Sequence, residues 1–300
     1  MGRCLVAFAL VGAGACNAHL GDPNQHVVGA DGGGPSDGTD ATMVDAVIPL
    51  GAWGTPAVIP GADDATNNED DPTLSSDGLE LYYAVAVPPT GDKNLYLMSR
   101  ASRADAFGTP VILSAFNTVN SDEGPRLSYD DLTIYFGQNG DIFTSTRATP
   151  ASPWGAISVV PGVSTAVYEK WMSVCGDNSH FVVSRLNGVN GQDLYEGTLG
   201  NGAGTLIATV SSTAAETSTF LSKDCLTLYF ASSRGAIGTQ IYISTRAAIG
   251  DAWGAPALAP APFDTSTDNE DAGYTPDNRL FVFASTRAGN GTKDLFLSTR

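Results

Sequence analysis

The feature that most constrains this fold is a unit of about fifty residues that recurs five times along the chain. Each unit carries an Asp that opens a tight turn, and successive anchors lie 53, 47, 47 and 53 residues apart. Such a corner often needs the positive φ that Asp, Gly and Asn tolerate. The five anchors are Asp77, Asp130, Asp177, Asp224 and Asp277. A repeat of this length indicates a solenoid, a propeller or a similar array.

Four short strands surround each anchor. In the first unit a polar strand, 72–75, precedes the Asp turn, and an apolar strand, 81–83, follows it. A third strand, 94–97, comes after a loop, and the aromatic-Gly step at 107–108 opens a fourth. Four strands in a unit of this length are typical of a β-propeller blade, and no useful helical periodicity separates the units. We therefore expect an all-β, five-bladed β-propeller of four-stranded blades.

The two ends of the repeat region predict how the ring closes. The fifth unit reaches Arg300 without its outer strand, whereas a surplus aromatic-Gly strand, 53–59, precedes the first unit. We expect this N-terminal strand to complete the last blade, because closure removes the open edges of the sheets.

Two stretches carry a resemblance to a known family. Asn68-Glu69-Asp70-Asp71-Pro72, and 228–234 running on to 241–244, resemble WD40-like β-propeller repeats of the type in the C-terminal propeller of TolB. The resemblance covers residues 53–300 and is weakest in the third unit. It implies a periplasmic or surface platform for proteins or envelope polymers, and it implies no catalytic activity.

The N-terminal segment is typical of export. After Arg3, residues 4–15 form a small, apolar run that is shorter than the roughly 20 residues needed to span a bilayer. The segment 1–15 therefore predicts a signal peptide of lipoprotein type with lipidation at Cys16; the alternative is a plain signal cleaved after Ala15. Residues 16–50 hold five Asp and few large apolar side chains, which predicts a flexible acidic tether before a propeller at 51–300. We expect a lipid-anchored protein of the cell envelope, periplasmic or at the outer membrane.

The charge of the chain limits its partners. A net charge of −17 and a pI near 4.3 exclude nucleic acid, which requires clustered Lys and Arg. We expect contact with the membrane only through the N-terminal lipid, a monomeric state, and a protein or cell-wall polymer as partner.

Acidic residues precede every inner strand and predict a ring at the mouth of the channel. Like charges converging there need a cation, Lys or Arg beside them; the alternative is that they cap turns and strand ends. Oxygen ligands favour Ca²⁺, but no spacing matches an EF-hand loop, so we otherwise expect no cofactor and no metal. The candidate binding residues of this ring are Glu69, Glu123, Glu169, Glu216 and Glu270.

The third unit departs from the repeat. Tyr168, Lys170 and Trp171 flank Glu169 where the other units carry polar residues. An aromatic side chain beside charged groups can stack a sugar or anchor a peptide, so these residues are candidates for binding. The alternative is that Trp171 only fills space in a degenerate blade.

Two cysteines lie near equivalent anchors of neighbouring units. Cys175 comes two residues before one anchor, and Cys225 comes one residue after the next. Both are expected at the same end of the ring, either as a disulfide in an oxidising compartment or as two free buried thiols.

The sequence assigns no catalytic residue. His180 is the one His in the repeat region, and no nucleophile elbow accompanies it. The leading hypothesis is a non-catalytic envelope lipoprotein whose propeller acts as a binding and scaffolding platform. The alternative is a glycosidase-like, carbohydrate-active enzyme that uses acidic residues at the channel mouth. It requires two carboxyl groups in unequal environments facing one cleft.

Overall fold

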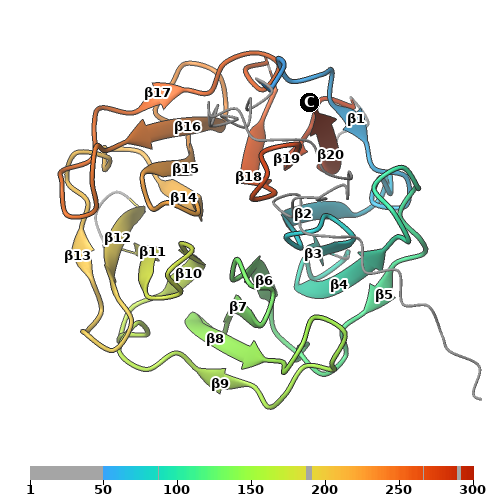
Figure 1. Cartoon of the computed structure of the whole chain (residues 1–300), viewed down its shortest axis with the longest axis horizontal. Coiled ribbons are helices and arrows are strands. Elements are labelled where there is room, and N and C mark those ends of the chain that lie inside the picture. Colours follow the sequence, from blue (N-terminus) through green and yellow to red (C-terminus); the bar gives the residue numbers. More distant parts are fainter. Residues whose placement is uncertain (1–49, 87, 187–190, 266, 289–291) are drawn as a thin grey trace, which may run out of the picture. The chain divides into compact units, whose positions relative to one another are not determined.

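The structure, a computed structural model, describes residues 50–300 except 87, 187–190, 266 and 289–291. Five four-stranded antiparallel sheets are arranged as blades around a central axis (Figure 1), which confirms the predicted five-bladed β-propeller. The described residues contain no helix, and so none that is long and apolar enough to cross a membrane. The predicted signal peptide, Cys16 and almost all of the tether lie outside the described residues.

Each blade runs from an inner strand at the axis to a two-residue outer strand. Blade 1 holds β2 (Asn68–Leu74), β3 (Glu80–Ala86), β4 (Lys93–Ser99) and β5 (Val111–Ile112). Blade 2 holds β6 (Asp122–Leu127), β7 (Thr133–Gln138), β8 (Asp141–Thr146) and β9 (Ser158–Val159). Blade 3 holds β10 (Glu169–Val174), β11 (His180–Leu186), β12 (Gln192–Thr198) and β13 (Thr205–Leu206). Blade 4 holds β14 (Glu216–Leu221), β15 (Thr227–Ser232), β16 (Gln240–Thr245) and β17 (Ala257–Leu258). Blade 5 holds β18 (Asn269–Tyr274), β19 (Leu280–Ser285), β20 (Asp294–Thr299) and, from the N-terminal side, β1 (Ala57–Val58).

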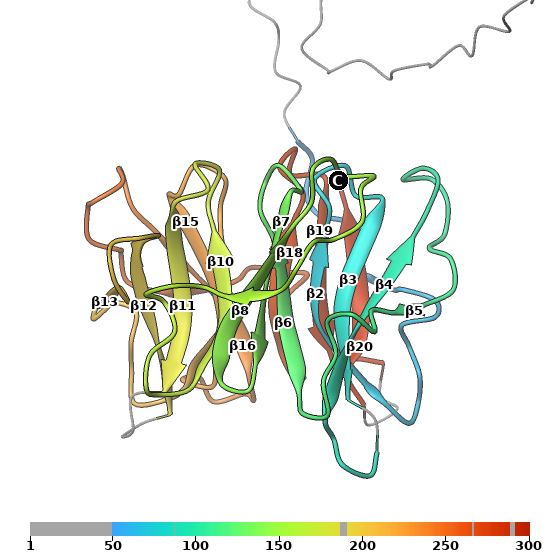
Figure 2. The same ribbon diagram turned by 90° about the horizontal axis from the view of Figure 1, so that it is seen from below.

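The ring closes as the chain ends predict. β1 pairs antiparallel with β20, with Ala57 opposite Leu297, so the N-terminal strand completes blade 5. Trp53 packs edge-on against Phe281, and the Arg300 guanidinium lies 4.1 Å from the Trp53 ring centroid. Figure 2 shows the same ring from its side, with β2 to β5 next to β18 to β20, and Figure 1 shows β1 beside β20. Closure therefore joins the first and last parts of the described chain by both hydrogen bonds and packing.

The hydrophobic core lies between adjacent blades. The second strand of each blade is apolar because neighbouring blades cover both of its faces; every residue of β19 is buried. Phe281 and Phe283 of blade 5, for example, pack with Ile241 and Tyr229 of blade 4. Complete burial of a side chain of this size contributes about 1.5–3 kcal/mol, so these contacts hold the blades at a fixed spacing.

The Asp anchors form the predicted turns at the end of each inner strand. In four blades a Ser or Thr hydroxyl two residues earlier donates to the anchor carboxylate at 2.5–2.6 Å. The residue after each anchor has φ between 53° and 72°. Gly, Asn and Asp tolerate this conformation and occupy four of the five positions, and Cys225 adopts it in blade 4. In blade 3, Cys175 takes the place of the hydroxyl residue. We call this side of the ring the turn end and the opposite side, where the inner strands begin, the entry end.

The arginines that close the third strands pin these turns. Each donates from Nε to a carbonyl of its turn and lies over the ring of the following aromatic-Gly step, 4.1–4.4 Å from the ring centroid. Each of these guanidinium groups therefore links the end of a third strand to the Asp turn and to the segment that leads into the outer strand. This shared role explains why the Arg recurs in the sequence. The four are Arg100, Arg147, Arg246 and Arg300.

Candidate functional site in the central channel

Every inner strand carries a β-bulge at the same position, six residues before its anchor. The residue there has a positive φ in all five blades, between 49° and 61°. Such bulges redirect a side chain, and left-handed backbone at Asp, Trp or Ser is a strain that concentrates at functional sites. We call these five residues the axial belt: Asp71, Gly124, Trp171, Ser218 and Asp271.

Hydrogen bonds connect all five members of the axial belt. The Asp71 carboxylate accepts from the Gly124 N–H at 3.1 Å and from the Trp171 indole N–H. The Asp271 carboxyl group accepts from the Asp71 N–H at 3.2 Å and from the Ser218 hydroxyl. One residue of every blade therefore contributes to a single polar network at the axis, with Asp71 and Asp271 as its centre.

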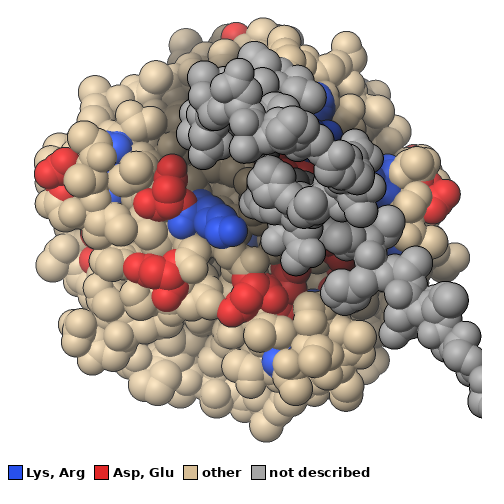
Figure 3. All heavy atoms as spheres, in the orientation of Figure 1, with Lys and Arg blue, Asp and Glu red and all other residues tan. Residues whose placement is uncertain are grey.

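Three lysines neutralise the carboxylates above the belt. Lys93 Nζ lies 2.7 Å from Asp70, 3.1 Å from Asp71 and 3.5 Å from Glu123. Lys293 Nζ lies 3.3 Å from Asp70 and also contacts Glu270, and Lys170 Nζ contacts Glu123. Figure 3 shows Lys or Arg and Asp or Glu side chains next to one another around the centre of one face. The charged ring predicted from the sequence is therefore compensated by lysines.

The carboxyl groups of this site have opposite pKa shifts. Burial would raise the pKa of Asp70, but Lys93, a hydrogen bond from Asp271 and Lys293 outweigh it and hold that pKa well below its usual range. Burial and then the charges of Asp70 and Asp71 raise the pKa of Asp271 well above its usual range. Burial and then the charge of Asp70 also raise the pKa of Glu270. At Asp71 too, burial is outweighed by Lys93, so its pKa is lowered; the site thus holds two carboxyl groups with lowered pKa values beside two with raised ones.

Spacing decides which carboxyl groups can act on a substrate. Asp70, Asp71 and Asp271 each have an oxygen within 4.8 Å of the others, and Asp271 hydrogen-bonds Asp70. A glycosidic bond does not fit between groups in such contact, since glycosidase carboxyl groups stand about 5 Å or more apart. Asp70 and Glu270 instead each contact the Lys293 ammonium group. Their side chains are 7% and 14% exposed, and that of Lys293 is 26% exposed, so this pair is the one nearest to solvent.

The same acidic cluster is where a hard cation would bind, because three carboxylates converge within the described residues. The contacts with Lys93 and Lys293 already supply positive charge at two of its carboxylates. The expectation of a weak Ca²⁺ site remains a prediction.

The structure divides the predicted acidic ring into two sets. Glu123 and Glu270 lie in the channel, whereas Glu69, Glu169 and Glu216 are buried one position earlier on their strands. Glu169 accepts from Thr165 and Arg185. Glu216 accepts in the same way from Ser212 and Arg234. Alternation along a strand turns adjacent residues to opposite sides, so these three point away from the side that Glu123 and Glu270 occupy. Glu169 and Glu216 make the capping contacts of the alternative reading, and a binding role for Glu69, Glu169 and Glu216 stays a prediction.

Glu69 lacks the partners of its counterparts. It is 3% exposed, Ala65 stands where the others have Thr or Ser, and its Oε2 has no hydrogen-bond partner among the described residues. Burial, then the charges of Asp294 and Asp64, raise its pKa to about 7. Because the folded protein then holds this proton more tightly than the unfolded chain does, stability is greatest below pH 4.5, the ordinary pKa. It falls as the pH rises towards 7.

We predict that Glu69→Gln removes the loss of stability that the wild type shows as the pH rises. Gln resembles the protonated side chain, so the variant matches the wild type at pH 4 and exceeds its free energy of unfolding by about 1–2 kcal/mol at pH 8. Urea denaturation at both pH values measures this difference. Glu169→Gln is the matched control, and it lowers stability at pH 8 because it breaks the pair with Arg185. A Glu69→Gln protein that is less stable than the wild type at pH 8 would contradict the assignment.

The third blade supplies an aromatic side to the entry end. Trp171 is 8% exposed, bonded to Asp71 and covered by Lys170, whose Nζ lies 4.0 Å from the Trp171 ring centroid. Trp171 is therefore a member of the belt and not an open stacking surface. Tyr168 is 41% exposed, and its hydroxyl donates to Glu123 at 2.8 Å. It lines a pocket of about 250 Å³ together with Asn139, Gly140, Asp141, Thr165, Ala166 and Val167.

Sequence reasoning missed Lys93 and Lys293, and it did not separate Asp70, Asp71 and Asp271 from their neighbours. The sequence did hold one signal for the belt. The position six residues before each anchor recurs in all five units, but its residue type varies among Asp, Gly, Trp and Ser. A repeated position that varies in this way is a better candidate for function than one that is conserved in type across the blades.

Of the two alternatives for the cysteines, the structure has the disulfide. Cys175 and Cys225 are bonded, with their Cα atoms 5.2 Å apart, and both are buried. The bridge lies at the turn end and joins blades 3 and 4.

Comparisons with known proteins identify the fold. No family model matches the chain, and no curated protein matches it by sequence. An α-L-arabinofuranosidase from Podospora anserina is similar in structure, with a TM-score of 0.55 and 15% identity over 83% of this chain and 96% of that one. An endo-arabinase from Bacteroides thetaiotaomicron is similar with a TM-score of 0.53 and 12% identity, covering 81% and 96%. TolB from Acinetobacter baumannii has a TM-score of 0.47 and 14% identity, covering 78% of this chain and 55% of TolB.

These comparisons correct two expectations from the sequence. The non-catalytic platform, and with it the absence of enzyme activity, was expected from the signal at Cys16, the five repeats and the scarcity of catalytic residues, whereas the proteins similar in structure include two α-L-arabinofuranosidases and an endo-arabinase. At 12–16% identity these likenesses establish the fold alone. The expectation of a non-catalytic role is corrected in favour of the carbohydrate-active alternative, and the residues of the channel must carry the argument for a reaction.

Proposed function

We propose that this protein is a carbohydrate-active enzyme of the glycosidase type, with its active site at the entry end of the channel. The observation that carries the proposal is a pair of carboxyl groups with opposite pKa shifts, lowered at Asp70 and raised at Glu270, that both contact the Lys293 ammonium group. Hydrolysis of a glycosidic bond needs one carboxylic acid to protonate the leaving oxygen and one carboxylate on the opposite side. The similarity in fold to arabinofuranosidases supports the substrate class.

Each residue of the site has a role in this scheme. Glu270 donates its proton to the leaving oxygen, and Asp70 activates water or attacks the anomeric carbon. Asp271 is a positioning residue, because its hydrogen bond keeps Asp70 oriented and ionised. Lys93, whose Nζ lies 2.7 Å from Asp70, also lowers the pKa of Asp70. Tyr168 and the pocket beside it offer an exposed aromatic surface on which a sugar ring can stack.

Hydrolysis of a glycan panel tests the proposal. We expect the full-length protein to release reducing sugar from arabinan, arabinoxylan or another furanoside-bearing polymer, and the Asp70→Asn/Glu270→Gln double variant to fall to background. Glu196→Gln is the control, because it changes a partly exposed carboxylate in an ion pair with Arg246, away from the channel. Circular dichroism establishes that all three proteins are folded. Equal release by the wild type and the double variant, or no release from any glycan, would refute the proposal.

We also propose that the enzyme is delivered to the cell envelope by a lipid on Cys16. The support is the sequence pattern of residues 1–16, and the finer assignment to WD40-like envelope repeats rests on the sequence motifs alone.

A further inference from the structure

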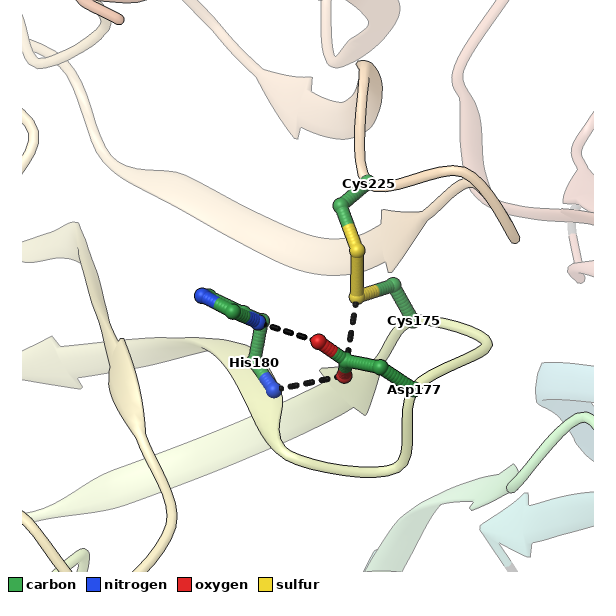
Figure 4. Close-up of side chains that lie close together, drawn as sticks. All are labelled: Cys175, Asp177, His180 and Cys225. Carbon is green, nitrogen blue, oxygen red and sulfur yellow. Dashed lines mark hydrogen bonds and ion pairs between the residues drawn. A yellow bond between two sulfur atoms is a disulfide. The ribbon is translucent and has the colours of Figure 1, made fainter. Parts of the chain in front are cut away.

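Three residues of blades 3 and 4 break the repeat pattern at one point of the turn end. Cys175 replaces a Ser or Thr, His180 replaces Glu, Thr or Leu, and Cys225 replaces Gly, Asp or Asn. With the anchor Asp177 they form a group in which each residue offers one ligand atom, all within 4.8 Å of one another. Figure 4 shows the His180 ring and the Cys175–Cys225 bridge converging on the Asp177 carboxylate. Repetition of the scaffold does not explain why all three departures carry metal-binding side chains.

We propose that Cys175, Cys225, His180 and Asp177 form a Zn²⁺ site when the disulfide is reduced. Two thiolates, one imidazole and one carboxylate are a ligand set that Zn²⁺ prefers. In a tetrahedral site such ligands lie roughly 3.3–3.8 Å apart, so the observed grouping needs only small movements of side chains. The site lies at the turn end, away from the proposed active site, and it is independent of the proposed activity.

The backbone holds these two turns together without the disulfide. The Gly176 N–H donates to the Lys223 carbonyl at 2.8 Å, which links the turn of blade 3 to the turn of blade 4. Arg246 Nε donates to the Cys225 carbonyl at 2.9 Å, and the Cys225 N–H donates to the Ser222 carbonyl at 2.9 Å. Both cysteines also belong to the apolar core of these blades. Breaking the S–S bond therefore leaves the two sulfur atoms facing the same space.

Asp177 and His180 are already oriented towards this space. Asp177 Oδ1 lies 3.4 Å from Cys175 Sγ and accepts the N–H groups of Ser179 and His180 at 2.8 and 2.9 Å. Its Oδ2 contacts His180 Nδ1. The side chains of His180 and Asp177 are 32% and 37% exposed, whereas the cysteines are buried, so a metal ion can approach from solvent on the side of the imidazole and carboxylate.

Conversion of the disulfide into the Zn²⁺ site requires only a dithiol reductant and the metal ion. A dithiol reductant breaks the S–S bond, each cysteine sulfur gains one electron and one proton, and the dithiol closes to its own disulfide. Zn²⁺ then displaces the two thiol protons and binds the thiolates, imidazole and carboxylate. The site is thus a switch between a covalent bridge and a metal bridge across the same two blades.

Cobalt binding by the full-length chain tests the proposal. All forms carry Cys4→Ser and Cys16→Ser, so that Cys175 and Cys225 are the remaining cysteines. A trialkylphosphine reduces the protein and is itself oxidised to the phosphine oxide with oxygen from water. We expect the reduced form to bind one Co²⁺ with the visible bands of tetrahedral coordination and the ultraviolet bands of thiolate ligation. Zn²⁺ should displace it, and the oxidised form should show neither set of bands.

Variants separate this site from simple thiol binding. His180→Ala and Asp177→Asn should each weaken Zn²⁺ binding by at least about 10-fold. Asp77→Asn, the same change at the anchor of blade 1, should leave it unchanged. Where reduction lowers the circular dichroism signal, Zn²⁺ should restore it. The proposal is overturned by a reduced protein that binds no Co²⁺, by affinity that His180→Ala and Asp177→Asn do not alter, or by lost structure that Zn²⁺ does not restore.

Discussion

Replacing Glu270 by Gln is expected to lower kcat/KM on a natural glycan by about 10²- to 10⁴-fold, the usual contribution of a general acid. The loss should be much smaller on an aryl glycoside whose leaving group is a stable phenolate, because such a group departs without protonation. The variant should also lose the alkaline limb of the pH profile, since burial and the charge of Asp70 raise the pKa of Glu270 and activity requires its proton. Steady-state kinetics on both substrates across pH measure these effects.

Asp70→Asn should behave differently from Glu270→Gln. Asp70 is the carboxylate that the lysines keep ionised, so its loss should lower kcat/KM by about 10⁴-fold on both substrates, whatever the leaving group. Glu196→Gln again serves as the unaffected control. If Glu270→Gln slows both substrates equally and keeps the alkaline limb, Glu270 is not the general acid.

The fold was predictable because its signals are local and repeated. An Asp that opens a tight turn recurs at a spacing of about fifty residues, so five such anchors indicate five blades before any tertiary contact is known. The surplus strand at 53–59 likewise predicts its pairing with β20, because only one sheet lacks an outer strand. These inferences need spacing and strand geometry alone.

The site was predictable only in part, because a one-residue difference in strand position decides which carboxylate enters the channel. Glu69 and Asp70 are adjacent and chemically alike, yet one is buried against Asp294 and the other contacts two ammonium groups. The β-bulge at Asp71 sets this register. An Asp does not by itself require the left-handed backbone that Asp71 adopts, so the sequence does not reveal the bulge. Lys93 begins β4 of blade 1, and Lys293 directly precedes β20 of blade 5; these two blades are neighbours only in the closed ring.

Arg126 beneath the belt should be the most costly single side chain to remove. It is 1% exposed, and its Nη1 donates to the Pro72 carbonyl of blade 1 at 2.8 Å. Its Nε donates to the Thr219 carbonyl of blade 4 at 3.2 Å. This guanidinium of blade 2 therefore joins three blades across the axis and faces the charges of Asp71 and Asp271.

We expect Arg126→Met to lower the free energy of unfolding by about 3–5 kcal/mol, because it leaves buried carbonyls unpaired and removes a positive charge beside buried carboxylates. Arg103→Met is the matched control. Arg103 is 31% exposed and pairs with Asp277 at 2.5 Å, so its loss should cost no more than about 1 kcal/mol. Urea denaturation of both variants, followed by circular dichroism, measures the difference. Equal losses would mean that the ring is held by packing between blades and that Arg126 merely fills the axis. A larger loss at Arg126 would show that the polar contacts which order the belt also hold the ring closed, so that stability and the arrangement of Asp70 and Asp71 depend on the same side chain.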